Sequence, residues 1–163
     1  MAVTIIDGDL FNTKAKYICH QVNCQGKMGS GVAAQIREKF PEAYEDYNKL
    51  CSMTKNKEVL LGEVQTVHCK TGVVICNLFG QLNYGYNGKT FTSYDAFKNA
   101  IDWLNRYIPD GETVAMPFRI GCGLGGADWN RISKMIEQGL GATHTVELWR
   151  WNPRAKKSNT NEG

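Results

Sequence analysis

Two glycine-rich loops, each placed between a predicted strand and a predicted helix, constrain the fold of this 163-residue chain more than any other feature. The first loop comprises residues 23–31 (NCQGKMGSG) and the second comprises residues 118–126 (FRIGCGLGG). Strands that alternate with helices favour an α/β arrangement, in which a mostly parallel sheet is covered on both faces. Ligands bind to such sheets beyond the carboxyl ends of the strands. Both loops are expected at that edge.

Short runs rich in β-branched and aromatic residues predict six strands, over residues 3–6, 17–22, 62–69, 73–79, 113–117 and 143–149. Apolar residues that recur every three or four positions predict helices over 32–40, 94–108 and 129–140, and a further helix after Pro41. The third and fourth strands are separated by Lys-Thr-Gly, a spacing typical of a hairpin. The pattern therefore predicts one domain with a mixed, mostly parallel sheet of about six strands.

Composition limits the classes of function that remain open. Hydrophobic residues make up 42% of the chain, enough for a core over residues 1–151, whereas the polar segment 152–163 is expected to be disordered. No apolar run is long enough for a membrane helix, and the N-terminus lacks a signal-peptide core, so we expect a cytoplasmic protein without a membrane partner. The net charge of +3 suits a small anionic ligand better than extended nucleic acid. We expect a monomer.

The six cysteines show neither a CxxC pair nor a metal-binding spacing with histidine, so no metal site is predicted. Glycine-rich loops that lead into helices suit phosphate groups, because the backbone can approach closely and the first N–H groups of the helix are unpaired. Neither loop contains the P-loop pattern. The second loop contains GxGxxG, but too little chain follows it for a dinucleotide fold. Two such loops fit one ligand with a diphosphate between them.

Three segments, residues 8–10 (GDL), 20–31 and 117–125, together resemble a macrodomain. The most similar branch includes the ADP-ribose-1''-phosphate phosphatases and the terminal ADP-ribose glycohydrolases. Residues 20–47 resemble the phosphatase type, and residues 119–124 resemble the glycohydrolase type. The resemblance covers residues 3–149. It implies a three-layer α/β/α macrodomain that binds an ADP-ribose derivative without a cofactor or metal.

The resemblance also implies positions for the ligand. Asp9 would accept a hydrogen bond from the adenine amino group, Leu10 would lie against the ring, and Trp149 or Trp151 would lie near it. Asn23 would lie beside the distal ribose, unless it only forms an Asx turn. Backbone donors for the distal ribose and the diphosphate would come from both loops: Gly29, Ser30, Gly31, Val32, Gly121, Cys122, Gly123, Leu124 and Gly125. Tyr84 and Tyr86 either line the pocket or cover it.

Catalytic residues are harder to assign. The glycohydrolase branch uses a lysine and an aspartate, but residues 77–80 (NLFG) and Gly125 replace them here. His20 is similar in position to a histidine of the phosphatase branch, and an imidazole that titrates near neutral pH could donate a proton or orient water. Asp128 is a candidate partner for it. The alternatives are a structural histidine and a helix-capping aspartate.

The sequence therefore leads to one main functional hypothesis, the hydrolysis of ADP-ribose 1''-phosphate to ADP-ribose and phosphate. A second hypothesis is the removal of ADP-ribose from modified protein, nucleic acid or nucleotide. A third is a module that binds ADP-ribose derivatives without turnover. Cys24 and Cys122 border the loops, but no activating base is evident beside them, so they are interpreted as packing residues.

Overall fold

The computed structural model describes residues 2–85 and 89–151, so the tail predicted to be disordered and Tyr86 lie outside the described residues. A six-stranded sheet of order β1-β6-β5-β2-β4-β3 forms the centre of this part of the chain. All neighbouring strands are parallel except β3 and β4, which form the predicted antiparallel pair. The strands are β1 (Val3–Asp7), β2 (Tyr17–Asn23), β3 (Val64–His68), β4 (Val74–Gln81), β5 (Thr113–Pro117) and β6 (Thr145–Arg150). The predicted mixed sheet is confirmed.

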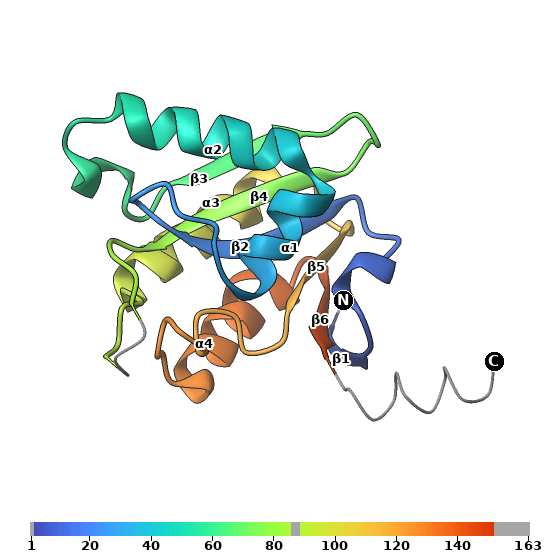
Figure 1. Cartoon of the computed structure of the whole chain (residues 1–163). Helices are drawn as coiled ribbons and strands as arrows, with labels where there is room; N and C mark the ends of the chain where they lie inside the picture. The colour runs from blue at the N-terminus through green and yellow to red at the C-terminus, as the bar shows by residue number, and fades with distance from the viewer. Residues whose placement is uncertain (1, 86–88, 152–163) are drawn as a thin grey trace, which may run out of the picture.

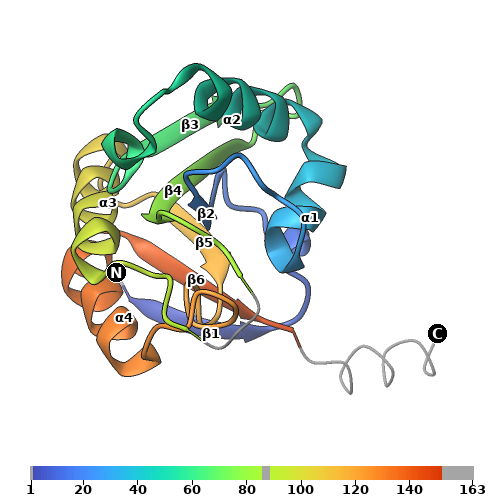
Figure 2. The same ribbon diagram turned by 60° about the vertical axis from the view of Figure 1, so that its left-hand side comes forward.

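Helices cover both faces of the sheet (Figures 1 and 2). One face carries α1 (Gly31–Lys39) and α2 (Pro41–Met53), and the other carries α3 (Tyr94–Tyr107), α4 (Trp129–Ile136) and the π-helical turn η3 (Glu137–Gly141). Two short 3₁₀ helices, η1 (Leu10–Asn12) and η2 (Lys57–Leu60), complete the fold. The three-layer α/β/α architecture is confirmed. Within residues 2–85 and 89–151, no helix combines the length and apolar character needed to span a bilayer.

The apolar core is divided by the sheet. Toward α3 and α4 the buried side chains include Phe97, Ile101 and Leu104, which repeat at helical spacing along α3. Toward α1 and α2 the buried side chains include Ile36 and Tyr47. Strand β4 is buried along nearly its whole length, as expected for an inner strand with helices on both faces.

The observed helices differ from the predicted ones at their ends. Helix α1 ends at Lys39 rather than at Phe40, and Pro41 begins α2, where its missing N–H group leaves no bond unmade. The single helix predicted over 129–140 is instead α4 followed by η3. The wider turn brings Gly139 against Ile101 of α3, a contact that leaves no space for a side chain.

Candidate functional site

Both glycine-rich loops border one cavity of about 620 Å³ at the carboxyl ends of β2, β4 and β5. This volume is typical of sites for small ligands. Ten of the predicted site residues line it: His20, Asn23, Gly29, Ser30, Gly31, Val32, Gly121, Gly123, Leu124 and Gly125. Residues 31–33, the first turn of α1, also line the cavity, and N–H groups in a first helical turn have no partner within the helix, so this turn suits a bound anion.

The first loop is organised from within by Asn23. The Asn23 Oδ1 atom accepts hydrogen bonds from Gln25 N at 2.9 Å, from Lys27 N at 3.3 Å and from the Tyr47 hydroxyl at 2.9 Å. Its Nδ2 atom donates to Lys27 O at 2.9 Å. The Asx-turn interpretation is therefore confirmed. The same side chain also lines the cavity, so a ligand contact is compatible with this structural role.

The second loop is held by the neighbouring segment 89–92. The N–H groups of Phe91 and Thr92 donate to Gly125 O at 2.8 and 3.0 Å, and the Thr92 hydroxyl donates to Gly121 O at 2.8 Å. A Cβ atom on Gly125 would lie 2.5 Å from Gly121 O and 2.5 Å from Thr92 Oγ1. Glycine is thus required at position 125 by packing.

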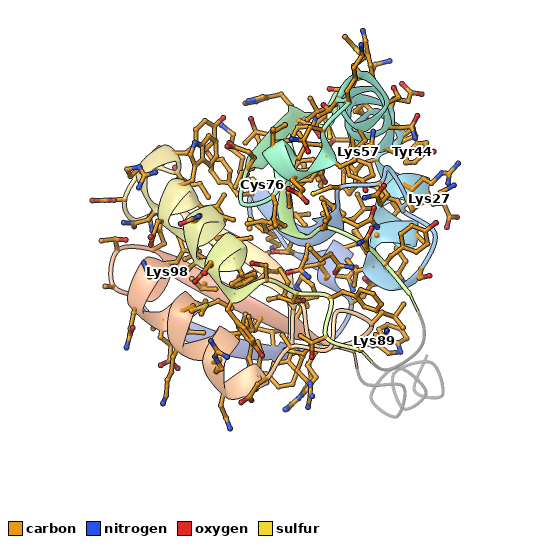
Figure 3. The ribbon with its side chains drawn as sticks, turned by 90° about the vertical axis from the view of Figure 1, so that its left-hand side faces the viewer. Lys27, Tyr44, Lys57, Cys76, Lys89 and Lys98 are labelled. Atoms are coloured by element: carbon orange, nitrogen blue, oxygen red, sulfur yellow. The ribbon has the colours of Figure 1, made fainter. Side chains whose placement is uncertain are left out.

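Arg119 has a backbone conformation that is unusual for its residue type. Its φ of 63° lies in the left-handed region, where an L residue with a side chain is strained. Its side chain is exposed and lines the cavity beside the second loop. Lys27 of the first loop is also exposed and lines it, so each loop contributes a cation. Figure 3 shows Lys27 on the same side of the molecule as Tyr44 of α2, away from Lys98 of α3.

His20 belongs to a row of polar side chains that crosses three strands. It pairs in register with Asn77 of β4, which pairs with Gln65 of β3. The His20 Nε2 atom lies 2.6 Å from Asn77 Oδ1, the Asn77 amide donates to Gln65 Oε1 at 3.1 Å, and the Gln65 amide donates to Asp46 O of α2 at 3.1 Å. This direction of donation makes Nε2 the protonated ring nitrogen of His20.

The second ring nitrogen of His20 is therefore an acceptor. His20 is only 1% exposed, and its Nδ1 atom is buried without a hydrogen-bond partner among the described residues. Burial lowers the pKa of His20 to about 4, an effect that the hydrogen bond to Asn77 only partly offsets. The expectation that this imidazole titrates near neutral pH is wrong. At neutral pH the His20 ring is therefore uncharged, and the residue lines the cavity.

Three residues expected near the adenine lie together beside the cavity rather than on its lining. Asp9 caps η1 by accepting from Phe11 N at 3.0 Å. Leu10 is buried in the same apolar cluster that Trp149 packs against. The Trp149 indole donates to Glu147 at 3.0 Å, and its backbone oxygen accepts from Phe118 N at 2.8 Å. Phe118 itself lines the cavity, so it connects Trp149 and its neighbours to the cavity wall.

The remaining two candidates do not line the cavity either. The Asp128 carboxylate caps α4 by accepting from Asn130 N at 3.0 Å, which agrees with the helix-capping alternative. The Cys122 side chain turns into the core, and burial raises the pKa of its thiol. Burial likewise raises the pKa of Cys24 to about 12, so neither thiol is activated as a nucleophile.

Sequence reasoning did not identify several residues that line the cavity, above all Gln21, Gln81 and Arg119. Gln21 alternates with His20 on an inner strand, and nothing in the strand pattern separates it from a surface glutamine. Tyr84, expected either to line the pocket or to cover it, lines the cavity. Within the described part of the chain, no three His, Cys, Asp or Glu side chains gather in a way that could hold a metal ion.

Comparison with known proteins gives this arrangement a family. Residues 19–136 match the model of the Macro domain. The chain belongs to the Macro domain family. Macrodomain relatives include the ADP-ribose 1''-phosphate phosphatase of Saccharomyces cerevisiae, 28% identical over 83% of this chain and 92% of that protein. The Thermus aquaticus DNA ADP-ribosyl glycohydrolase is 25% identical over 91% of this chain.

This macrodomain spans only 40% of the length of the Thermus aquaticus relative. Among solved structures, a Bacteroides thetaiotaomicron protein of unknown function is 26% identical, with a TM-score of 0.78 over 91% of this chain and 98% of that one. The predicted family and its fold are thus confirmed.

Proposed function

We propose that this macrodomain binds an ADP-ribose derivative between the two loops and hydrolyses ADP-ribose 1''-phosphate to ADP-ribose and inorganic phosphate. The observation that carries the proposal is that His20, whose uncharged Nδ1 atom is buried without a hydrogen-bond partner among the described residues, lines a cavity bordered by both loops. The phosphatase relative supports it, because that relative matches this chain over most of both lengths. The first turn of α1, with Lys27 and Arg119, supplies the positive potential that phosphate groups need.

The acceptor character of Nδ1 determines what His20 contributes. A phosphate oxygen is itself an acceptor, so a water molecule has to stand between it and the ring. The water oxygen attacks phosphorus, the bond from phosphorus to the ribose oxygen breaks, and Nδ1 receives the proton of the water. That proton then passes to the released ribose oxygen. Asn77 holds the imidazole in the tautomer that this step requires.

The test combines substrates with a matched pair of histidine variants. Wild-type protein is expected to release phosphate from ADP-ribose 1''-phosphate, and His20→Ala is expected to lower kcat about 100-fold. The affinity of His20→Ala for ADP-ribose should stay within a few-fold of wild type. His68→Ala is the control, because His68 lies exposed on β3 and does not line the cavity. Equal loss of turnover and affinity in His20→Ala would assign His20 a structural role only.

The glycohydrolase relative supports an alternative, the release of ADP-ribose from a modified macromolecule. Incubation with ADP-ribosylated DNA and ADP-ribosylated protein, in parallel with the phosphate ester, separates the two activities. Free ADP-ribose from the modified DNA, with the ester left intact, would replace the phosphatase assignment. Binding of ADP-ribose with no product from any of the three substrates would identify a binding module.

A further inference from the structure

Gln21 lies at the centre of a second polar network, on the side of β2 that faces the second loop. Its Nε2 atom donates to Gln81 Oε1 at 2.8 Å and to Thr92 Oγ1 at 2.7 Å. His20, the preceding residue, belongs instead to the row that ends at Asp46 of α2. The two neighbouring side chains therefore reach the cavity through separate sets of partners.

The network fixes which end of the Gln21 amide faces its partners. Gln81 uses its own amide nitrogen to donate to Asn83 O at 2.7 Å, so its Oε1 atom is left toward Gln21. The Thr92 hydroxyl donates its proton to Gly121 O at 2.8 Å and can only accept from Gln21. Exchanging oxygen and nitrogen in Gln21 would set one carbonyl oxygen against another. The carbonyl end of Gln21 is therefore held in a single orientation.

That carbonyl oxygen has no partner among the described residues. Gln21 Oε1 is buried without a hydrogen bond, and Gln21 lines the cavity. Glycines make room for it: a Cβ atom on Gly121 would lie 3.0 Å from this oxygen, and one on Gly80 would overlap it. A buried acceptor without a donor reduces stability. An acceptor that is fixed through the bonds of its amide to Gln81 and Thr92, and left unpaired on a residue that lines the cavity, is suited to a donor on the ligand.

The chemistry of that donor follows from the acceptor. Phosphate groups offer mainly acceptors at neutral pH, so this oxygen cannot bind the diphosphate. A sugar hydroxyl can donate. The choice of the distal ribose rests on the proposed function, in which His20 assists release of the phosphate that this ribose carries. We propose that Gln21, the next residue, is a specificity-determining residue that accepts a hydrogen bond from a hydroxyl of the distal ribose. Gln81 and Thr92 act as its positioning residues.

The experiment compares ADP-ribose with its 2''-deoxy and 3''-deoxy forms by calorimetry. Wild-type protein is expected to bind ADP-ribose about five- to tenfold more tightly than one of the deoxy forms, the range for one hydrogen bond. Gln21→Met is expected to bind ADP-ribose and that same deoxy form with nearly equal affinity. Gln25→Met is the matched control and should keep the wild-type ratio, because Gln25 donates to Leu82 O and does not line the cavity.

The ratio of affinities separates recognition from damage to the loop, because a disturbed loop weakens both ligands alike. An unchanged ratio in Gln21→Met would overturn the inference and leave the proposed function standing. Failure of the wild-type protein to bind ADP-ribose at all would overturn the proposed function itself. Thr92→Val provides a second test if Gln21→Met does not fold. It frees the Gln21 amide to rotate and is expected to lower the ratio, and an unchanged ratio would again contradict the inference.

Discussion

The two glycine-rich loops of this macrodomain have similar compositions, but the glycines that border open space and those that pack against the chain are distributed differently between them. In the first loop, a Cβ atom on Gly29 or Gly31 would have no neighbour within 4 Å. In the second loop, a Cβ atom on Gly125 or Gly126 would lie within 3 Å of backbone oxygen atoms. Gly29 and Gly31 of the first loop, like Gly123 of the second, therefore leave space that a ligand can enter, whereas Gly125 and Gly126 allow the second loop to pack against residues 89–92. Glycine content alone does not distinguish these two roles.

The hydrogen bonds that hold the two loops also come from different sides of the sheet. Asn23 and Tyr47 hold the first loop through side-chain hydrogen bonds, on the side of the sheet covered by α1 and α2. Gln21 and Thr92 hold the second loop from the other side, next to the strained Arg119. The cavity thus has an open half at the first loop and a tightly packed half at the second.

The largest expected effect compares one glycine from each loop. Gly125→Ala is expected to lower the free energy of unfolding by about 3 kcal/mol, because the methyl group meets Gly121 O and Thr92 Oγ1 at 2.5 Å. Gly29→Ala has no such neighbour and should change it by less than about 0.5 kcal/mol. Neither glycine has a positive φ, so the pair isolates packing. Urea denaturation measures the free energy of unfolding of both variants. Similar losses of stability in the two variants would remove the distinction between the two halves of the cavity.

His20 of the cavity lining makes the stability of the protein depend on pH. The pKa of His20 is lowered in the folded protein to about 4, from 6.5 in the unfolded chain. The unfolded state therefore binds more protons between these values, and the contribution of His20 is present above pH 6.5 and lost as the pH falls toward 4. Unfolding free energy is expected to drop by about 2 kcal/mol between pH 7 and pH 5 through this group. Urea denaturation of His20→Gln should show a correspondingly smaller drop, and an equal drop would contradict the assignment.

The packed half contains strain that glycine can relieve. Arg119→Gly is expected to raise the free energy of unfolding by about 1 kcal/mol, because glycine adopts a φ of 63° without a steric penalty. The same variant should bind ADP-ribose several-fold more weakly, since it loses the guanidinium group on the cavity lining. Arg119→Ala keeps the strain and should lose affinity without gaining stability. Thermal unfolding and calorimetry measure the two effects. Unchanged affinity in both variants would show that Arg119 takes no part in binding.

Much of the fold follows from local patterns. Alternating strands and helices, the Lys-Thr-Gly hairpin and the helical spacing of Phe97, Ile101 and Leu104 predict the layers and the antiparallel pair. The end of α4 does not follow, because the π-helical turn depends on the contact of Gly139 with Ile101 in another helix. Local sequence carries no signal for such a contact.

The sequence predicted the parts of the site that consist of loop backbone. It did not predict the parts that depend on side chains from distant segments of the chain. The loop glycines could be located because glycine marks the close approach of a ligand or a turn. The acceptor state of His20 could not, since it depends on Asn77 and Gln65 from two other strands. Gln21 was overlooked for the same reason, because its partners lie 60 and 71 residues away in the chain.

Calorimetric titration with ADP-ribose and with AMP tests the central claim most directly, namely that both loops bind one ligand across the cavity. Binding between both loops predicts one site per chain and an affinity for ADP-ribose at least about tenfold higher than for AMP, which lacks the second phosphate and the distal ribose. Gly29→Ala and Arg119→Ala, one change in each half, should each weaken the binding of ADP-ribose. Equal affinities for the two nucleotides, or a response to a change in only one loop, would contradict the claim.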